Sequence, residues 1–283
     1  MTEQTIAGFD LDAYCERIGY AGERAATPAA LAGIVARQAA AIPFENLNPL
    51  LGLPVALDLA AVAEKLVAQG RGGYCFEHNR LLWAALEALG FAVSGLAARV
   101  VWNAPEGAVT PRGHMLLRVD LGGQTLIADT GFGGLTLTAP LALEPGIEQP
   151  TPHEPFRLEA AEAGYVLQAQ VGGAWKPLYA FDLQRQHPVD YIAANWYLST
   201  HPQSHFVTGL MAARPDDGRR HALRNNQLTT HYVNGDQARS VLGSAGELRQ
   251  ALEDVFLIRL PDAPGLGQAL ERIAAGDPLA GAA

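Results

Sequence analysis

Hydrophobic positions in the first 90 residues recur at the steps of three and four that amphipathic helices show. Thr27 and Pro28 suit the cap and the first turn of one helix, and Pro43 ends it. A second run predicts a helix from about Tyr74 to Gly90, where the glycine ends it. The positions that set its spacing are Cys75, Asn79, Leu82, Leu86 and Leu89. The first part of the chain is therefore predicted to be helical.

The pattern changes after residue 90 to short apolar runs separated by Gly-Gly or Pro, which is typical of antiparallel sheets and small barrels. The clearest runs are 95–102, 114–120, 125–129 and 165–171. The last third combines a strand-like run at 229–233 with a helical pattern at 245–256. The chain ends in Gly- and Ala-rich sequence, which we expect to be mobile.

Residues 114–130 form two strand-like runs joined by a Gly-Gly pair, which predicts a hairpin. Counting outward from a two-residue loop at 122–123 puts Leu116 opposite Asp129. Because paired residues share a face, as do residues two apart, His114 and Asp129 project from the same side as diagonal neighbours, about 7 to 8 Å apart at Cα. We expect the core stripe on the other face, so core packing does not account for this pair. That stripe is Met115, Leu117, Val119, Leu126 and Ala128.

One of the two cysteines lies where the Gly-rich run at 71–74 becomes a helix. There the unpaired N–H groups and the helix dipole favour the thiolate of Cys75, which is the nucleophilic form. With His114 as its base and Asp129 orienting the base, Cys75 completes a Cys-His-Asp triad for acyl transfer. His78, one turn along the helix, is the alternative base. A small buried hydrophobe is the alternative interpretation of Cys75.

Four ordered motifs resemble the arylamine N-acetyltransferases, and the resemblance extends over nearly the whole chain, from 14–20 to 195–200. The motifs are Ile-Pro-Phe-Glu-Asn-Leu at 42–47, Arg-Gly-Gly-Tyr-Cys-Phe-Glu-His-Asn at 71–79, His-Met-Leu-Leu at 114–117 and Asp-Thr-Gly-Phe-Gly-Gly at 129–134. The resemblance implies that Cys75 becomes acetylated and that Glu45 and Arg71 form a structural ion pair. Thr130 stands where the family more often has Val. Since the two side chains are similar in shape, we expect little consequence.

The resemblance also implies the fold, an α+β protein with a helical bundle (1–90), an antiparallel β-barrel (91–204) and an α/β lid (205–283). It implies acetyl transfer from acetyl-CoA to aromatic amines or hydrazines in a double-displacement cycle. The expected amine pocket consists of Phe44, Tyr74, Phe132 and Phe206. The turn at Gly131, Phe132 and Gly133 allows close approach of the CoA phosphates. A second candidate for the phosphates is the cluster Arg219, Arg220 and Arg224.

Composition narrows the classes of function. The chain has 283 residues, 49% of them hydrophobic, which is enough for a sizeable core. With 20 basic against 29 acidic residues, the net charge of −9 argues against a nucleic-acid partner. Cys15 and Cys75 form no CxxC or Cys/His cluster, so neither a disulfide scaffold nor a metal site is predicted.

No apolar run has the length of a signal peptide in the first 20 residues, or of a membrane span anywhere, so we expect a cytoplasmic enzyme without a membrane partner. Two other functions stay open. A thiol hydrolase of the transglutaminase and papain kind would use the same triad, and a binding module would retain it without turnover. Exclusion of water from the thioester distinguishes a transferase from a hydrolase.

Overall fold

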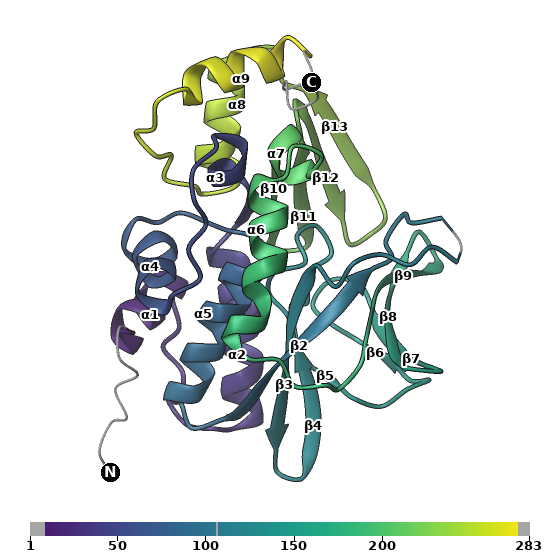
Figure 1. The fold of residues 1–283 in the computed structure, drawn as a ribbon. Coiled ribbons are helices and arrows are strands. Elements are labelled where there is room, and N and C mark those ends of the chain that lie inside the picture. The colour runs from purple at the N-terminus through teal and green to yellow at the C-terminus, as the bar shows by residue number, and fades with distance from the viewer. Residues whose placement is uncertain (1–8, 106, 277–283) are drawn as a thin grey trace.

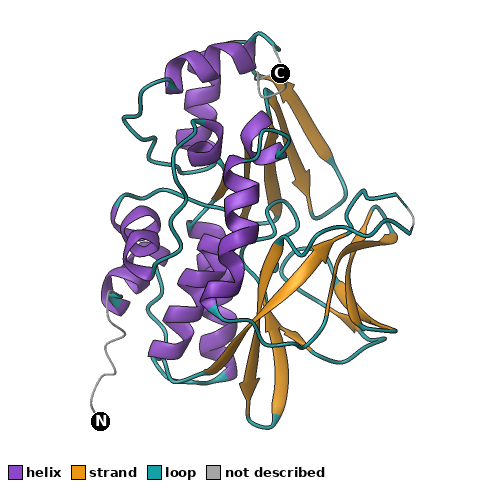
Figure 2. Cartoon of the chain, in the orientation of Figure 1, coloured by secondary structure: helices purple, strands orange, loops and turns teal. Residues whose placement is uncertain are grey.

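Helices form the N-terminal part of the protein and strands dominate the rest (Figure 1; Figure 2). The computed structural model describes residues 9–105 and 107–276. The Gly- and Ala-rich end at 277–283, expected to be mobile, lies outside the described residues. The N-terminal elements are α1 (Leu11–Ile18), α2 (Pro28–Ala41), α3 (Leu47–Leu50), α4 (Leu59–Ala63), the π-helical turn η1 (Glu64–Ala68) and α5 (Cys75–Ala88).

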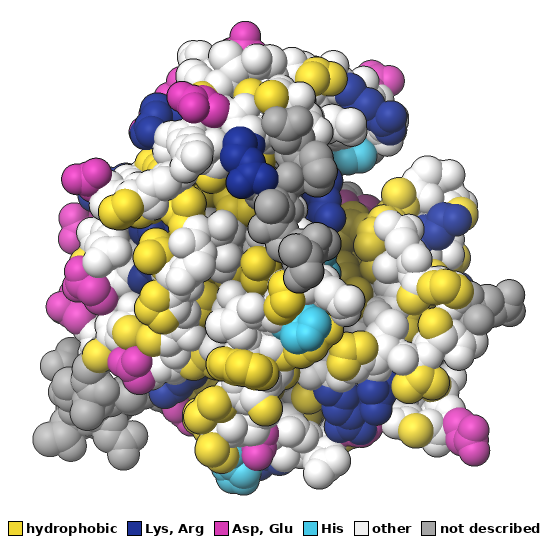
Figure 3. Space-filling model, turned by 45° about the horizontal axis from the view of Figure 1, so that its top comes forward, with side chains coloured by type: hydrophobic (Ala, Val, Ile, Leu, Met, Phe, Trp, Pro, Cys, Tyr) yellow, Lys and Arg dark blue, Asp and Glu magenta, His cyan; other side chains and the backbone are white. Residues whose placement is uncertain are grey.

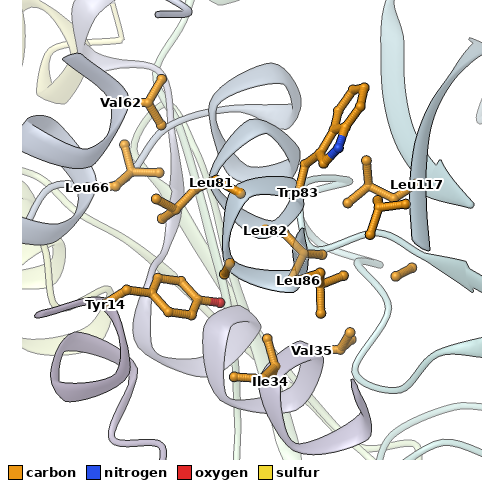
Figure 4. Packing of buried hydrophobic residues seen from close by; sticks show 14 of the residues in the cluster. Tyr14, Ile34, Val35, Val62, Leu66, Leu81, Leu82, Trp83, Leu86 and Leu117 are labelled. Atoms are coloured by element: carbon orange, nitrogen blue, oxygen red, sulfur yellow. The ribbon is translucent and has the colours of Figure 1, made fainter. Parts of the chain in front are cut away.

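Helix α5 packs against α1, α2 and α4, and against strand β3 on another face (Figure 4). It begins after Tyr74, whose N–H donates to the Glu77 carboxylate over 3.1 Å. It ends at Ala88, two residues before Gly90, which has a φ of +87°. The predicted helix is confirmed to within two residues at each end. Its buried side chains join the largest hydrophobic cluster because neighbours cover the helix all round.

Eight antiparallel strands form a nearly closed barrel in the order β5-β4-β3-β2-β9-β8-β7-β6. They are β2 (Ala92–Val100), β3 (His114–Leu121), β4 (Gln124–Ala128), β5 (Leu141–Ala142), β6 (Glu148–Gln149), β7 (Phe156–Ala161), β8 (Gly164–Val171) and β9 (Ala174–Phe181). The predicted register of the β3–β4 hairpin is confirmed, since Leu121 pairs with Gln124 and Leu117 with Ala128. Gly122 and Gly123 both have positive φ, as a primed two-residue turn requires.

Both faces of this hairpin are buried, which corrects one expectation. Met115 and Leu117 pack toward α5, as predicted, whereas Leu116 and Ile127 on the other face belong to a second core inside the barrel. The expectation that the face of His114 takes no part in core packing is therefore wrong. The reason is that the sheet curls until its concave side encloses hydrophobic side chains of its own.

The C-terminal part begins with the 3-10 turn η2 (Pro188–Tyr191), α6 (Ile192–Thr200) and α7 (His205–Thr208). A second sheet has the order β1-β10-β11-β12-β13, where β1 (Phe44–Glu45) comes from the N-terminal part. The remaining elements are β10 (Met211–Asp216), β11 (Arg219–Arg224), β12 (Gln227–Tyr232), β13 (Gln237–Val241), α8 (Ala245–Gln250), the π-helical turn η3 (Ala251–Val255) and α9 (Leu266–Ala274).

Strand β1 connects two parts of the molecule, because Phe44 pairs with Ala213 of β10 and also forms a bridge with Gly73, just before α5. The α+β fold of helical bundle, barrel and α/β lid is confirmed. The residue limits proposed for the three units, 1–90, 91–204 and 205–283, stay a prediction. None of the helices that the structure describes is long and apolar enough to cross a membrane.

Candidate active site

Cys75, His114 and Asp129 meet at the junction of α5 and the barrel. Cys75 is the first residue of α5, His114 the first of β3, and Asp129 follows the last residue of β4. Sγ of Cys75 lies 3.7 Å from the carbonyl oxygen of Gly113, the residue directly before His114. All three side chains are buried, with 4%, 3% and 0% of their surface exposed. The structure thus brings together the three residues that the sequence singled out.

His114 and Asp129 form a short hydrogen-bonded pair, since Nε2 of His114 lies 2.7 Å from Oδ2 of Asp129. Burial lowers the pKa of His114, but the charge and hydrogen bond of Asp129, with a smaller contribution from Cys75, outweigh it and raise this pKa to about 10. Burial also raises the pKa of Asp129, and the pairing with His114 reverses this and holds that pKa below its usual value. The pair is therefore an imidazolium and a carboxylate at neutral pH.

Two further side chains hold the Asp129 carboxylate, and neither was predicted as a site residue. Asn79 donates to Oδ1 of Asp129 over 2.9 Å, and Tyr179 of β9 donates to Oδ2 over 3.0 Å. The spacing gave a signal for Asn79, because it lies four residues after Cys75 and so on the same helix face. No local pattern marks Tyr179, which is separated from Asp129 by 50 residues.

The alternative base, His78, faces away from the thiol. Its Nε2 lies 3.0 Å from the carbonyl oxygen of Pro43, and burial lowers its pKa to about 4. Its neighbour Glu77 caps the helix and binds Lys65 over 2.6 Å. His78 is therefore a neutral, buried side chain that bonds the segment between α2 and β1.

The ion pair between Glu45 and Arg71, implied by the resemblance, is confirmed. Nη2 of Arg71 lies 2.7 Å and Nε 3.0 Å from the same oxygen of Glu45. The second oxygen of Glu45 accepts from the N–H of Leu47 over 2.6 Å. Since Glu45 lies in β1 and Arg71 precedes α5, the pair ties the start of the nucleophile's helix to the second sheet.

The four aromatic residues predicted for the amine pocket lie in two places. The ring of Phe206 lies 6.0 Å from that of Phe44 and 5.2 Å from that of Tyr74, measured between centroids. Phe132 lies 5.3 Å from His114 and 5.1 Å from Tyr179. The structure thus divides the four residues predicted for the amine pocket into a group of three and a single ring beside the base.

Tyr74 differs from the other three aromatic residues, because it is wholly buried and its hydroxyl bonds the side chain of Asn195. The roles of Phe44, Tyr74, Phe132 and Phe206 in binding an amine stay predictions.

The glycine turn after Asp129 packs against the start of α5. A Cβ added to Gly131 would lie 2.6 Å from the Cα of Cys75, so only glycine allows this approach. Gly133 has a φ of +81° and lies against the ring of Phe44. The binding of CoA phosphates by Gly131, Phe132 and Gly133 stays a prediction.

The second candidate for the phosphates, the arginine cluster on β11, is largely engaged within the protein. Arg219 binds Asp216 over 2.8 Å, and Arg220 binds Glu154 of the barrel over 2.6 Å. Arg224, at the end of the strand, is exposed.

The hydroxyl of Thr130 makes a contact that the expectation of little consequence, which considered shape alone, did not include. Its Oγ1 accepts a hydrogen bond from Nε2 of Gln38 over 2.7 Å inside the core. A valine has the same shape but no acceptor for this amide.

The residues 9–105 and 107–276 contain no group of three His, Cys, Asp or Glu side chains that could hold a metal ion. The surface is hollowed where the C-terminal part meets the barrel (Figure 3).

Comparison with known proteins gives matches over most of the chain. A family model described as N-acetyltransferase matches residues 28–264. An arylamine N-acetyltransferase of Mycobacterium tuberculosis (strain ATCC 25618 / H37Rv) is 46% identical over 257 residues, which cover 89% of this chain and 90% of that protein. One of Mycolicibacterium smegmatis is 44% identical over 260 residues, covering 90% and 94%. The solved structure of Mycobacterium marinum arylamine N-acetyltransferase in complex with CoA has a TM-score of 0.90 at 41% identity and covers 93% of this chain and 99% of that one.

Proposed function

The chain belongs to the arylamine N-acetyltransferase family, and from that premise we propose that it transfers the acetyl group of acetyl-CoA to arylamines through a thioester on Cys75. The observation that carries this mechanism is the buried pair of His114 and Asp129 beside a thiol at a helix start. A histidine held protonated by a carboxylate stabilises a neighbouring thiolate, and the thiolate is the form that attacks a thioester.

In the first half of the cycle, Sγ of Cys75 forms a bond to the carbonyl carbon of acetyl-CoA. The tetrahedral intermediate carries its negative charge on oxygen, and the free N–H of Cys75 at the start of α5 is the proposed donor to it. The intermediate collapses as the bond to the CoA sulfur breaks. His114 gives its proton to the leaving CoA thiolate, which leaves a neutral imidazole beside acetylated Cys75.

In the second half, the amine nitrogen attacks the carbonyl carbon of the thioester. The neutral ring of His114 accepts the proton that the amine loses, and the bond to Sγ of Cys75 breaks. The products are the N-acetylated amine and the thiolate–imidazolium pair, so that the enzyme returns to its initial state. Asp129 remains ionised throughout, because it bonds His114 in both states and holds the ring in one orientation.

Burial of the site favours transfer over hydrolysis. Only 4% of Cys75 and 3% of His114 is exposed, and Phe132 lies against the ring of the base. A thioester that water reaches slowly survives until an amine arrives. A binding module would retain the same buried pair, so turnover is what distinguishes it from the proposed enzyme.

The substrates follow from the same surroundings. The group of Phe44, Tyr74 and Phe206 supports an aromatic amine or hydrazine as acceptor, because aromatic rings pack well against one another. The M. marinum relative was solved with CoA bound, which supports an acyl-CoA donor here. We also propose a cytoplasmic location, since a reducing compartment keeps the thiol of Cys75 free. We propose no nucleic-acid partner, because the net charge is −9.

Measurement of CoA release tests this mechanism. With acetyl-CoA alone, the enzyme should release about one equivalent of CoA per site and then stall with Cys75 acetylated, which intact-protein mass spectrometry detects. With arylamine present, double-reciprocal plots at several amine concentrations should be parallel. Cys75→Ser should lose both properties, whereas Cys15→Ser, which alters the other buried free cysteine, should keep them.

Two outcomes would contradict the proposal. Intersecting double-reciprocal lines would require both substrates to be bound at once, which excludes the acetylated intermediate. Fast and continuing CoA release without an amine would favour the hydrolase.

A further inference from the structure

Gln38 is a polar side chain near the C-terminal end of α2, whose other buried residues are apolar. It lies in α2 among the buried residues that face the core, and none of its surface is exposed. All its hydrogen-bonding atoms have partners: Oε1 accepts from the hydroxyl of Tyr14 over 2.6 Å, and Nε2 donates to the carbonyl of His78 over 3.0 Å and to Oγ1 of Thr130 over 2.7 Å. A leucine would fill a core position of this kind without any such requirement.

The orientation of the Gln38 amide follows from its partners. The carbonyl of His78 can only accept, so the NH₂ group must face it and Oε1 must face Tyr14. Burial raises the pKa of Tyr14 well above its usual value, so its hydroxyl keeps the proton that it donates. The second N–H of Nε2 is thereby directed at Thr130.

Thr130 is the residue directly after Asp129, and both its backbone and its side chain are held. Its N–H donates to Oδ1 of Asn79 over 3.2 Å, and its hydroxyl oxygen accepts from Gln38. Asn79 belongs to α5 and Gln38 to α2, so two helices fix this residue from two directions. Only 2% of Thr130 is exposed, which leaves water little access as a substitute partner.

We propose that Gln38 and Thr130 are positioning residues for Asp129: the amide of Gln38 holds the Thr130 hydroxyl, and the backbone fixed in this way aims the Asp129 carboxylate at His114. The proposal rests on the role of Asp129 in the proposed function. Neither residue touches the reacting atoms. Their effect passes through the 2.7 Å contact between Asp129 and His114, and small displacements of catalytic groups slow a reaction strongly.

The isosteric variant Thr130→Val removes the hydroxyl and nothing else. The fold should survive, because Nε2 of Gln38 keeps its bond to the carbonyl of His78. We expect acetylation of Cys75 in a single turnover to slow by roughly 10-fold with KM for acetyl-CoA unchanged. The pKa of His114, followed by NMR of the ring, should fall by roughly half a unit or more, because a displaced carboxylate stabilises the imidazolium less.

Two variants separate positioning from general loss of stability. Thr130→Ser keeps the hydroxyl and should retain the rate and the His114 pKa. Thr138→Val is the matched control, because it removes another buried threonine hydroxyl, one that bonds His153 and Thr151 and not the triad. It should lower Tm without changing either readout. If Thr130→Val is insoluble, Gln38→Met removes the same hydrogen bond from the other side, together with the bonds of Gln38 to Tyr14 and His78.

A double-mutant cycle completes the test. If the two residues act through one hydrogen bond, adding Thr130→Val to Gln38→Met should slow acetylation by less than about 2-fold further. The proposal is overturned if Thr130→Val behaves as Thr138→Val does, with a changed Tm and an unchanged rate and His114 pKa. Asp129→Asn distinguishes this result from failure of the proposed function: were Asp129→Asn itself active, the triad would be wrong, and not merely the role of Gln38.

Discussion

Asn79 donates one hydrogen bond to the carboxylate of Asp129 over 2.9 Å and a second to the carbonyl of Met115 over 2.7 Å. It lies one turn after Cys75, and Met115 follows His114 in β3. A single side chain on the nucleophile's helix therefore contacts Asp129 itself and the strand that carries His114. This arrangement sets the relative position of three residues that are far apart in the sequence.

Asn79→Ala should lower kcat by roughly 10- to 100-fold while leaving the KM for arylamine nearly unchanged, because it loosens the triad and not the substrate pocket. Steady-state kinetics at saturating acetyl-CoA provides the measurement. Asn226→Ala, which removes a side chain bonded to the carbonyl of Ala274 in the C-terminal part, is the control. If kcat falls equally in Asn79→Ala and Asn226→Ala, Asn79 contributes to stability alone.

Asp129→Asn should nearly abolish acetylation, since an amide supports the wrong histidine tautomer and cannot stabilise an imidazolium. Without that carboxylate, burial should bring the pKa of His114 from about 10 to below its ordinary value, because burial is the largest influence on it. NMR of the ring checks this directly. A ring that still titrates near pH 10 in Asp129→Asn would contradict the assignment.

The raised pKa of His114 also predicts how stability depends on pH. A group whose pKa is higher in the folded state stabilises the fold fully below its unfolded pKa, about 6.5, and loses that contribution as pH rises through its folded pKa. Between pH 7 and 9, the free energy of unfolding of the wild type should therefore fall by up to about 1.4 kcal/mol per pH unit relative to that of Asp129→Asn. Urea unfolding of both proteins at pH 7 and pH 9 measures the difference between their free energies of unfolding. If this difference is the same at both pH values, the prediction is wrong.

Arg71→Met should destabilise the protein by about 3 to 5 kcal/mol, because it leaves the charge of Glu45 buried without its partner. Burial raises the pKa of Glu45, but Lys65 and Arg71 outweigh it and hold that pKa low. Glu45 thus stabilises the fold above its unfolded pKa, and this contribution is lost as pH falls through the lower folded value. Glu45→Gln combined with Arg71→Met should be milder than Arg71→Met alone, as urea unfolding would show.

Gly131→Ala should impair activity by roughly 100-fold, because the added Cβ would lie 2.6 Å from the Cα of Cys75 and must displace the start of α5 or the turn. Gly134→Ala is the matched control in the same turn, since an added Cβ there meets no atom within 4 Å. Comparison of single-turnover acetylation in the two variants decides the matter. Full activity in Gly131→Ala would show that the turn can move without affecting the thiol.

Much of the site could be predicted from local sequence. The Gly-Gly turn at 122–123 has only a few conformations that join two strands, so it fixed the register that puts His114 and Asp129 on one face. Helical spacing after Tyr74 placed Cys75 in a first turn, where the backbone supplies N–H groups. The ion pair of Glu45 and Arg71 came from the resemblance and not from spacing, since its partners lie 26 residues apart.

The sequence by itself determined the elements and the faces on which the nucleophile, base and orienter lie, because turn geometry and helical period act over a few residues. Only the tertiary structure decided what surrounds them. Tyr179 reaches Asp129 across 50 residues and Gln38 reaches Thr130 across 92, and the closure of the barrel buried the face of the hairpin that we expected to be outside the core. Such contacts depend on how the elements pack, and no periodicity along the chain records which polar side chains will meet inside a core.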